Sequence, residues 1–237
     1  MPTLSNSVVL VTGANGGIGT RLVHDALERG ARKVYATARS PRTWDDDRIV
    51  PLTLDVTDPT SIAGAVQDAP DVTVLINNAG AIPPSASLLD VTEADIRANF
   101  DTNFFGPVLL ARAFAPVLDA HSGSALVDLH SVASWAAFGG AYSASKAALW
   151  SATNSLRLEL APRGVHVTGV HMGYVDTAMA AHADGPKLTP EELVRSVFDA
   201  VEADRFEVVA DDLTAGVKAG LSGPIEAMYP QLRSSEA

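Results

Sequence analysis

The sequence predicts an α/β domain in which a parallel sheet of about seven strands carries helices on both faces. Short apolar runs alternate with longer amphipathic stretches along the chain, which is the pattern of repeated strand–helix units. The chain has 237 residues, a length that α/β folds often reach as one domain. Hydrophobic residues make up 47% of it and charged residues 19%, a balance typical of a globular chain.

Seven short apolar runs are the predicted strands. The first, Val8–Thr12, is mostly apolar and is followed by a glycine-rich turn, as expected of a buried strand. In chain order the predicted strands are Val8–Thr12, Lys33–Ala38, Val50–Leu54, Val72–Ile76, Ala125–Leu129, Val165–Val170 and Phe206–Val209.

Capping residues, glycines and prolines set the limits of the predicted helices. The helix Ile18–Gly30 closes at its last glycine, and Asp58–Ala69 has Pro59 in its first turn. Thr92 opens a capping box and begins a long helix. Gly106-Pro107 is expected to kink or break that helix.

The second half of the chain continues the alternation as far as about residue 210. Tyr142–Leu160 is a predicted long helix, and Thr189 caps another. Residues 211–237 contain several glycines and prolines, which argue against one long helix there. Because no linker divides the chain, residues 1–237 are predicted to form a single domain.

Composition excludes several classes of function. The formal net charge is −11, whereas a sequence-independent nucleic-acid binder needs a basic surface, so we expect no nucleic-acid partner. No apolar run approaches the length of a membrane span, and the start of the chain lacks the features of a signal peptide. The chain has no cysteine, which fits a reducing compartment. We therefore expect a cytoplasmic protein without a membrane partner.

The chain carries six histidines but no pattern of metal-ligand spacing. We therefore expect no metal site. The absence of cysteine also excludes a thiolate nucleophile and Cys-ligated zinc.

The turn after the first strand is the first candidate functional feature. Thr12-Gly13-Ala14-Asn15-Gly16-Gly17-Ile18-Gly19 connects a strand to a helix. In that context glycines let the backbone approach a pyrophosphate, and the helix N-terminus faces the anion. Taken alone, the same residues also fit a tight turn that binds no ligand.

A basic residue follows at the distance where dinucleotide-binding folds read the ribose 2′ position. Arg39 lies 20 residues after Gly19, just past the second predicted strand, and Ala38 stands where an acid might be. An Arg there accommodates a 2′-phosphate, whereas an acid suits a free 2′-hydroxyl. This favours NADP(H) over NAD(H), with an ordinary surface arginine as the alternative.

From about residue 5 to residue 210 the chain resembles the short-chain dehydrogenase/reductase family. Thr12-Gly13-x-x-x-Gly17-Ile18-Gly19 matches the cofactor turn of that family, and Asn77-Asn78-Ala79-Gly80 matches its motif after the fourth strand. Asp55 matches the acid near the adenine, and Gly173–Thr177 resembles the segment that holds the nicotinamide amide. The positions that match the catalytic residues are Asn103, Ser131, Tyr142 and Lys146.

The resemblance implies a Rossmann-like doubly wound sheet and hydride transfer between NADP(H) and a carbonyl or alcohol carbon. It implies that Tyr142 is the general acid–base, that Lys146 lowers the pKa of Tyr142 and grips the ribose, and that Ser131 holds the substrate oxygen. Asn103 would hold a water that links Lys146 to solvent. The cofactor-binding residues implied are Gly13, Asn15, Gly17, Ile18, Gly19, Arg39, Asp55, Val56, Asn77, Ala79, Gly80, Tyr142, Lys146, Val175 and Thr177.

The chain departs from the family pattern in places. Met172 stands where the family usually has proline, and the segment between Ser131 and Tyr142 is shorter than usual. Asp128 and His130 replace small or amide residues on the fifth strand, and their effect on the site stays open.

The main functional prediction is an NADPH-preferring carbonyl reductase or alcohol dehydrogenase for a small or medium organic substrate. A 3-oxoacyl-thioester reductase and a non-catalytic NADP-binding sensor are the alternatives. In the helix Tyr142–Leu160 the apolar residues are not confined to one stripe, which indicates cover on more than one face. Together with the resemblance, this predicts a homodimer or homotetramer through the helices around 92–118 and 142–160.

Overall fold

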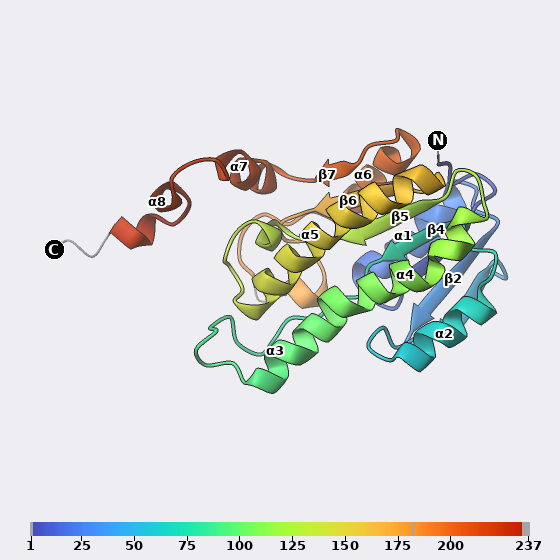
Figure 1. The fold of residues 1–237 in the computed structure, drawn as a ribbon, viewed down its shortest axis with the longest axis horizontal. Coiled ribbons are helices and arrows are strands. Elements are labelled where there is room, and N and C mark those ends of the chain that lie inside the picture. Colours follow the sequence, from blue (N-terminus) through green and yellow to red (C-terminus); the bar gives the residue numbers. More distant parts are fainter. Residues whose placement is uncertain (1, 182, 234–237) are drawn as a thin grey trace.

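Seven parallel strands form one sheet in the computed structural model, which describes residues 2–181 and 183–233 (Figure 1). Within these residues the strand order is β3-β2-β1-β4-β5-β6-β7. The order reverses direction between β1 and β4, and in such sheets ligands bind outside the carboxyl ends of the strands at that point. The strands are β1 Val8–Thr12, β2 Lys33–Ala38, β3 Ile49–Thr53, β4 Val74–Asn77, β5 Ala125–Leu129, β6 His166–His171 and β7 Glu207–Val209.

Helices cover both faces of the sheet because the central strands are apolar on both sides. In β1, Val9 and Val11 pack toward α1 (Gly17–Glu28) and α6 (Pro190–Glu202), whereas Val8 and Leu10 face the opposite helices. Those opposite helices are α2 (Pro59–Asp68), α4 (Gly106–Asp119) and α5 (Ala141–Leu160), and Figure 1 shows α4 and α5 lying across that face. The predicted doubly wound α/β fold is confirmed. No helix in the described residues is long and apolar enough to cross a bilayer.

The limits of most predicted elements differ from the structure by only one or two residues. β1, β2 and β5 have the predicted limits, whereas β4 begins at Val74 rather than Val72. Val72 is fully buried, but it lies before the hydrogen bonds that join β4 to β1. The N–H of the next residue, Thr73, donates to the Val8 carbonyl. Apolar character thus extends beyond the hydrogen-bonded strand.

The expected break at Gly106-Pro107 does not occur. The helix α3 (Glu93–Phe100) continues through a π-helical turn, Asp101–Phe105, directly into α4. The Gly106 N–H reaches back five residues to the Asp101 carbonyl, and Pro107 then stands at the start of α4, where its missing N–H costs little. The prediction of a kink or break at this point is therefore only partly right: the helix is interrupted by a π-turn, but the chain stays helical on both sides of it.

Residues 211–233 form an extension that we call the C-terminal arm. It consists of α7 (Asp212–Gly220), α8 (Ile225–Met228) and a short 3₁₀ turn, and it projects away from the sheet beyond β7 (Figure 1). The chain bends between the two helices at Gly223 and Pro224, which confirms that no long continuous helix forms there.

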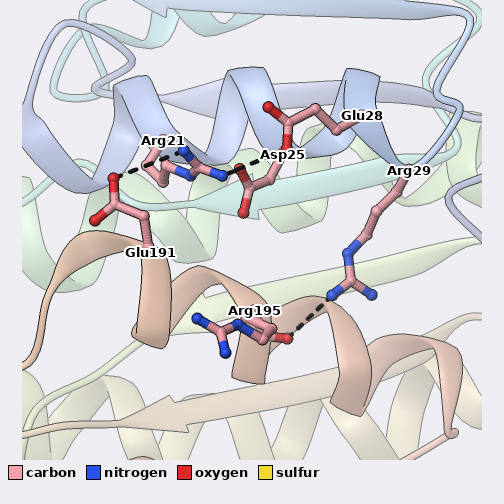
Figure 2. Close-up of a pocket in the computed structure, with 6 residues that line it drawn as sticks. All are labelled: Arg21, Asp25, Glu28, Arg29, Glu191 and Arg195. Atoms are coloured by element: carbon pink, nitrogen blue, oxygen red, sulfur yellow. Dashed lines mark hydrogen bonds and ion pairs between the residues drawn. The ribbon is translucent and has the colours of Figure 1, made fainter.

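A network of charged side chains joins α1 to α6 on the face opposite α5. Arg21 pairs with Asp25 on its own helix and reaches Glu191 on α6, with 3.6 Å between nitrogen and oxygen (Figure 2). Arg29 donates to the backbone carbonyl of Arg195 at 3.5 Å. Arg21 is also paired with Glu28, and Arg29 with Asp199 and Glu202, so we assign these ion pairs to the packing of the two helices.

The N-terminus of α6 has a complete capping box. The Thr189 hydroxyl accepts from the Glu192 N–H at 3.1 Å, and the Glu192 carboxylate accepts from the Thr189 N–H at 2.9 Å. We expect the Thr189→Ala variant to lower the free energy of unfolding by about 1 kcal/mol, because an N–H of the first turn loses its acceptor. Urea denaturation measures this loss. Ser196→Ala, which removes an exposed hydroxyl within the same helix, is the control and should leave the midpoint nearly unchanged. Equal midpoints for both variants would contradict the assignment.

Candidate active site

The turn between β1 and α1 requires glycine at two positions. Gly13 has φ of +65°, in the region that side-chain-bearing residues rarely adopt. A Cβ on Gly19 would lie 2.2 Å from the Gly13 carbonyl oxygen and 2.9 Å from the Cα of Ala14. The chain therefore approaches itself too closely there for any side chain.

Two polar side chains hold this turn against the end of β4. The Thr12 hydroxyl accepts from the N–H groups of Asn78, at 3.0 Å, and Ala79, at 2.9 Å. The Asn78 amide donates to the carbonyls of Thr12, at 2.7 Å, and Gly13, at 3.2 Å. Thr12 and Asn78 were not predicted as site residues, although both lie within the two motifs that resemble the cofactor-binding segments of the family.

The N-terminus of α1 is left open to an anion. Gly16 at its N-cap supplies no side-chain acceptor, and its first turn contains no acidic residue. By contrast, side chains of Asp58, Thr92, Thr189 and Asp211 cap α2, α3, α6 and α7. A helix start with unpaired N–H groups beside a glycine turn fits the pyrophosphate of a dinucleotide.

Three predicted cofactor residues lie near one another at the carboxyl ends of β2 and β3. Arg39 is exposed, and its charge helps to hold the pKa of Asp55 below its ordinary value, although the hydrogen bonds from Thr57 contribute more. The Asn15 amide donates to the Ser40 carbonyl at 2.9 Å, which ties the glycine turn to the loop that carries Arg39. This edge presents one cation and one carboxylate to a ligand.

Other predicted cofactor residues are held in the protein core. Val175 is buried, Val56 packs so that a Cβ on Gly106 would lie 3.1 Å from it, and Ile18 packs against the core under α1. Asn77 is also buried, and its amide donates to Asp128 at 2.8 Å. Because Val56, Asn77 and Val175 are buried, their contact with a ligand in the crevice at the carboxyl ends of β1 and β4 would come from their backbone.

Thr177, Ala79 and Gly80 line the space between the glycine turn and α5. A Cβ on Gly17 would lie 2.9 Å from the Thr177 methyl group, and one on Gly13 would lie 3.0 Å from the Cα of Ala79. A Cβ on Gly80 would lie 3.9 Å from the Lys146 ammonium. Small residues here keep the backbone of three segments close to the reactive side chains.

Ser131, Tyr142 and Lys146 converge at the N-terminal end of α5. The Tyr142 phenol is hydrogen-bonded to the Ser131 side chain. Lys146 lies one helical turn farther along, with its ammonium 5.9 Å from the centre of the Tyr142 ring, and donates to the Leu129 carbonyl at 2.7 Å. The structure thus brings together the three side chains to which the sequence reasoning gave chemical roles.

Burial shifts the pKa values of this group. It raises the pKa of Tyr142 above 10, and the hydrogen bond with Ser131 opposes that shift. Burial lowers the pKa of Lys146 to about 8, and the negative charge of Asp128 opposes the shift. Burial therefore decides the net direction of the Tyr142 shift, and the expectation that Lys146 lowers this pKa stays a prediction.

Asp128 is a fully buried carboxyl next to Leu129, whose carbonyl receives the Lys146 ammonium. Its oxygens accept from the Asn77 amide at 2.8 Å and the Thr153 hydroxyl at 2.7 Å. Burial raises the pKa of Asp128, while these two donors and the charge of Lys146 favour the carboxylate. The question that the sequence left open is answered, since Asp128 is paired and acts on the charge of Lys146.

His130 belongs to a buried aromatic stack behind Ser131. Its ring stacks on His171 with centroids 4.7 Å apart, and His171 stacks on Trp135 at 3.8 Å. Burial lowers the pKa of both histidines, that of His171 to about 3, so both rings are neutral at pH 7. His130 therefore packs rather than titrates.

In the described part of the chain no cluster of three or more His, Asp or Glu side chains could hold a metal ion.

Asn103 lies in the π-turn and is fully buried. Its amide donates to the Ala81 carbonyl at 2.8 Å and to the Ser145 hydroxyl at 3.1 Å, and its oxygen accepts from the Ala81 N–H at 2.9 Å. Asn99 joins this group through Ser145 and Ala81. Asn103 thus fixes the segment after Gly80 against α5, a role that the sequence did not predict.

Comparison with known proteins gives a family match for most of the chain. Residues 7–187 match the model of the short chain dehydrogenase family. A crystal structure of a short chain dehydrogenase from Burkholderia cenocepacia J2315 in complex with NADP is 35% identical, with a TM-score of 0.89 over 97% of this chain and 99% of that one.

Two curated relatives carry named activities. The NADPH-dependent 1-acyldihydroxyacetone phosphate reductase of Schizosaccharomyces pombe is 40% identical over 71% of this chain, but the match spans only 60% of that reductase. The ketoacyl reductase HetN of Nostoc sp. is 30% identical over 89% of this chain and 80% of its own length.

Proposed function

The chain belongs to the short-chain dehydrogenase/reductase family, and we propose that it transfers a hydride between NADP(H) and the carbonyl or alcohol carbon of a small or medium organic substrate. The convergence of Ser131, Tyr142 and Lys146 beside the glycine turn carries this proposal. The NADP-bound structural relative and the NADPH-dependent yeast relative support the choice of cofactor.

The chain's own residues fit NADP at each end of the crevice. The glycine turn and the uncapped start of α1 would hold the pyrophosphate, Arg39 the 2′-phosphate, and Lys146 and Thr177 the nicotinamide half. The bound nicotinamide supplies or accepts the hydride. What remains for the protein is to orient the substrate and to manage one proton.

Tyr142 is the proposed proton donor to the carbonyl oxygen during reduction. With a pKa above 10, its phenol is protonated at neutral pH and so carries the proton that the oxygen needs. Ser131, bonded to the same phenol, donates a hydrogen bond to the substrate oxygen and fixes its position. The buried Lys146 ammonium stabilises the phenolate that remains, since charges interact strongly in a low dielectric.

Arg39 is the proposed determinant of NADPH over NADH. We expect the Arg39→Ala variant to raise the KM for NADPH about 10- to 100-fold, because the 2′-phosphate loses a charge-assisted hydrogen bond, and to leave the KM for NADH unchanged. Steady-state kinetics with both cofactors measure the difference. Arg48→Ala, which removes an exposed arginine paired with Asp46, is the control and should leave both constants unchanged. Similar wild-type rates with NADH would count against this role.

Asp128 is proposed to set the alkaline limit of activity through Lys146. The Lys146 ammonium loses its charge as pH rises through about 8, so the rate of reduction should fall above that value. Because the Asp128 charge raises the pKa of Lys146, the Asp128→Asn variant should move this fall to lower pH. The pH dependence of kcat measures the shift, with the exposed Asp119→Asn as control. An unchanged profile, or a fall at higher pH, would contradict the assignment.

A 3-oxoacyl-thioester reductase is the second candidate, favoured by the similarity to the ketoacyl reductase HetN. Consumption of NADPH in the presence of ketones, aldehydes, quinones and 3-oxoacyl thioesters separates the two, with NADH run in parallel. Fast turnover of the thioester alone would support the second candidate. Cofactor binding without turnover of any compound would instead indicate a non-catalytic NADP-binding sensor.

A further inference from the structure

A cavity of about 330 Å³ lies between the C-terminal arm and the segment that precedes Tyr142. Its walls are mostly apolar and include Phe138 from that segment, Leu213 and Val217 from α7, and Met228 from α8. This volume is within the range of sites that bind small molecules. Phe138 and Leu213 are each about half exposed, at 53% and 52%, which leaves apolar surface open to a ligand.

The cavity adjoins the proposed catalytic group. Phe138 lies between Ser131 and Tyr142 in the chain, and a Cβ on the next residue, Gly139, would lie 3.4 Å from the Tyr142 ring. Phe138 therefore connects the wall of the cavity to the segment that packs against the Tyr142 side chain.

Two hydrogen bonds hold the arm against the segments that border the site. The Asp211 carboxylate, just before α7, accepts from the Gly173 N–H at 2.6 Å. The Tyr229 hydroxyl, just after α8, accepts from the Ala137 N–H at 2.9 Å. The arm is thus tied at both ends to the segments that contain the reactive tyrosine and the predicted nicotinamide contacts, and the cavity lies within this attachment.

The charges around the site disfavour an anionic substrate. The segments 79–92 and 131–145 contain no lysine or arginine, and segment 173–188 has one lysine against two aspartates. The cavity wall carries one acid, Asp212, and no base. Lys218 on α7 pairs with Glu207 and lies over the Trp135 ring, so its charge is already compensated. A carboxylate or phosphate in the cavity would be repelled by Asp212, and no lysine or arginine of the cavity wall would pair with it.

We propose that this cavity holds the hydrocarbon end of the substrate, and that the chain therefore prefers uncharged ketones or aldehydes with an apolar tail. This proposal rests on the proposed hydride transfer at Tyr142. Phe138 and Val217 would determine specificity for the tail. Phe138 lines the cavity from the segment between Ser131 and Tyr142, and Val217 lines it from α7.

A series of straight-chain 2-ketones from butan-2-one to decan-2-one tests the preference, with NADPH as reductant. We expect kcat/KM to rise about threefold for each added methylene until the cavity is filled, as burial of apolar surface predicts. A decan-2-one with a carboxylate at its far end should lose this gain. Reduction of all ketones at equal kcat/KM would overturn the proposal and leave the hydride transfer intact, whereas no NADPH oxidation with any of them would count against the hydride transfer itself.

A charge introduced into the cavity gives the second, independent test. Val217→Lys should lower the ratio of kcat/KM for decan-2-one over butan-2-one at least tenfold, and should raise kcat/KM for the carboxylated decanone relative to decan-2-one. Leu221→Lys adds the same charge just beyond α7, outside the cavity, and should keep the wild-type ratios. Size-exclusion chromatography accompanies both variants. If Val217→Lys changes the oligomeric state and not the ratio, the cavity is a contact between copies of the chain and the proposal is overturned.

Discussion

Replacing Tyr142 with phenylalanine is expected to lower kcat for carbonyl reduction about 10²- to 10⁴-fold, the usual contribution of a positioned general acid. The substitution removes the phenol that carries the transferred proton and that bonds to Ser131, while the ring keeps its contact with Gly139. Since the ring remains, the fold and the affinity for NADPH should be retained.

The measurement is NADPH consumption with a ketone that the wild-type chain reduces, together with NADPH binding by fluorescence. Tyr35→Phe is a matched control, because it removes a phenol that bonds to Lys33 and Asp71 far from the crevice. Turnover by Tyr142→Phe near the wild-type rate, with cofactor binding intact, would rule out the acid role of Tyr142.

Replacing Gly19 with alanine is expected to destabilise the chain by more than about 3 kcal/mol and to abolish NADPH binding. The new Cβ would lie 2.2 Å from the Gly13 carbonyl oxygen, and the atoms that must move are backbone atoms of the turn itself. Either the turn opens and the N–H groups of α1 lose their geometry, or the packing of α1 on the sheet is lost.

Gly64→Ala is the matched control, since a Cβ there meets nothing within 4 Å in the middle of α2. That variant should stabilise the chain by about 0.5–1 kcal/mol, because alanine favours a helix over glycine. Urea denaturation and NADPH titration of both variants give the comparison. If Gly19→Ala unfolds at the wild-type urea concentration and still binds NADPH, the close approach in the turn is not required.

Local pattern was enough to predict most of the sheet. The limits of β1, β2 and β5 were predicted without error. In these strands the apolar run covers the same residues as the hydrogen-bonded pairing with the neighbouring strand. The spacing of Tyr142 and Lys146 likewise placed both side chains on one face of a helix, and the structure has them so.

Features that depend on tertiary packing could not be predicted from the sequence. The direction of the Tyr142 pKa shift depends on burial, which the four-residue spacing does not contain. The partners of Asp128 come from β4 and α5, which no local pattern links to β5. The cavity of the C-terminal arm lies between segments distant in the sequence, which Asp211 and Tyr229 join by hydrogen bonds.

The π-turn Asp101–Phe105 makes the site sensitive to the length of the chain there. A wide turn contains one residue more than an α-helical path between the same end points, and one residue corresponds to about 100° of rotation about a helix axis. Deleting a single residue from Asp101–Phe105 would therefore turn either Asn103 away from Ala81 or the apolar face of α4 away from the sheet. The number of residues in this segment is thus fixed by two requirements, the position of Asn103 and the orientation of α4, that one regular α-helix cannot meet together.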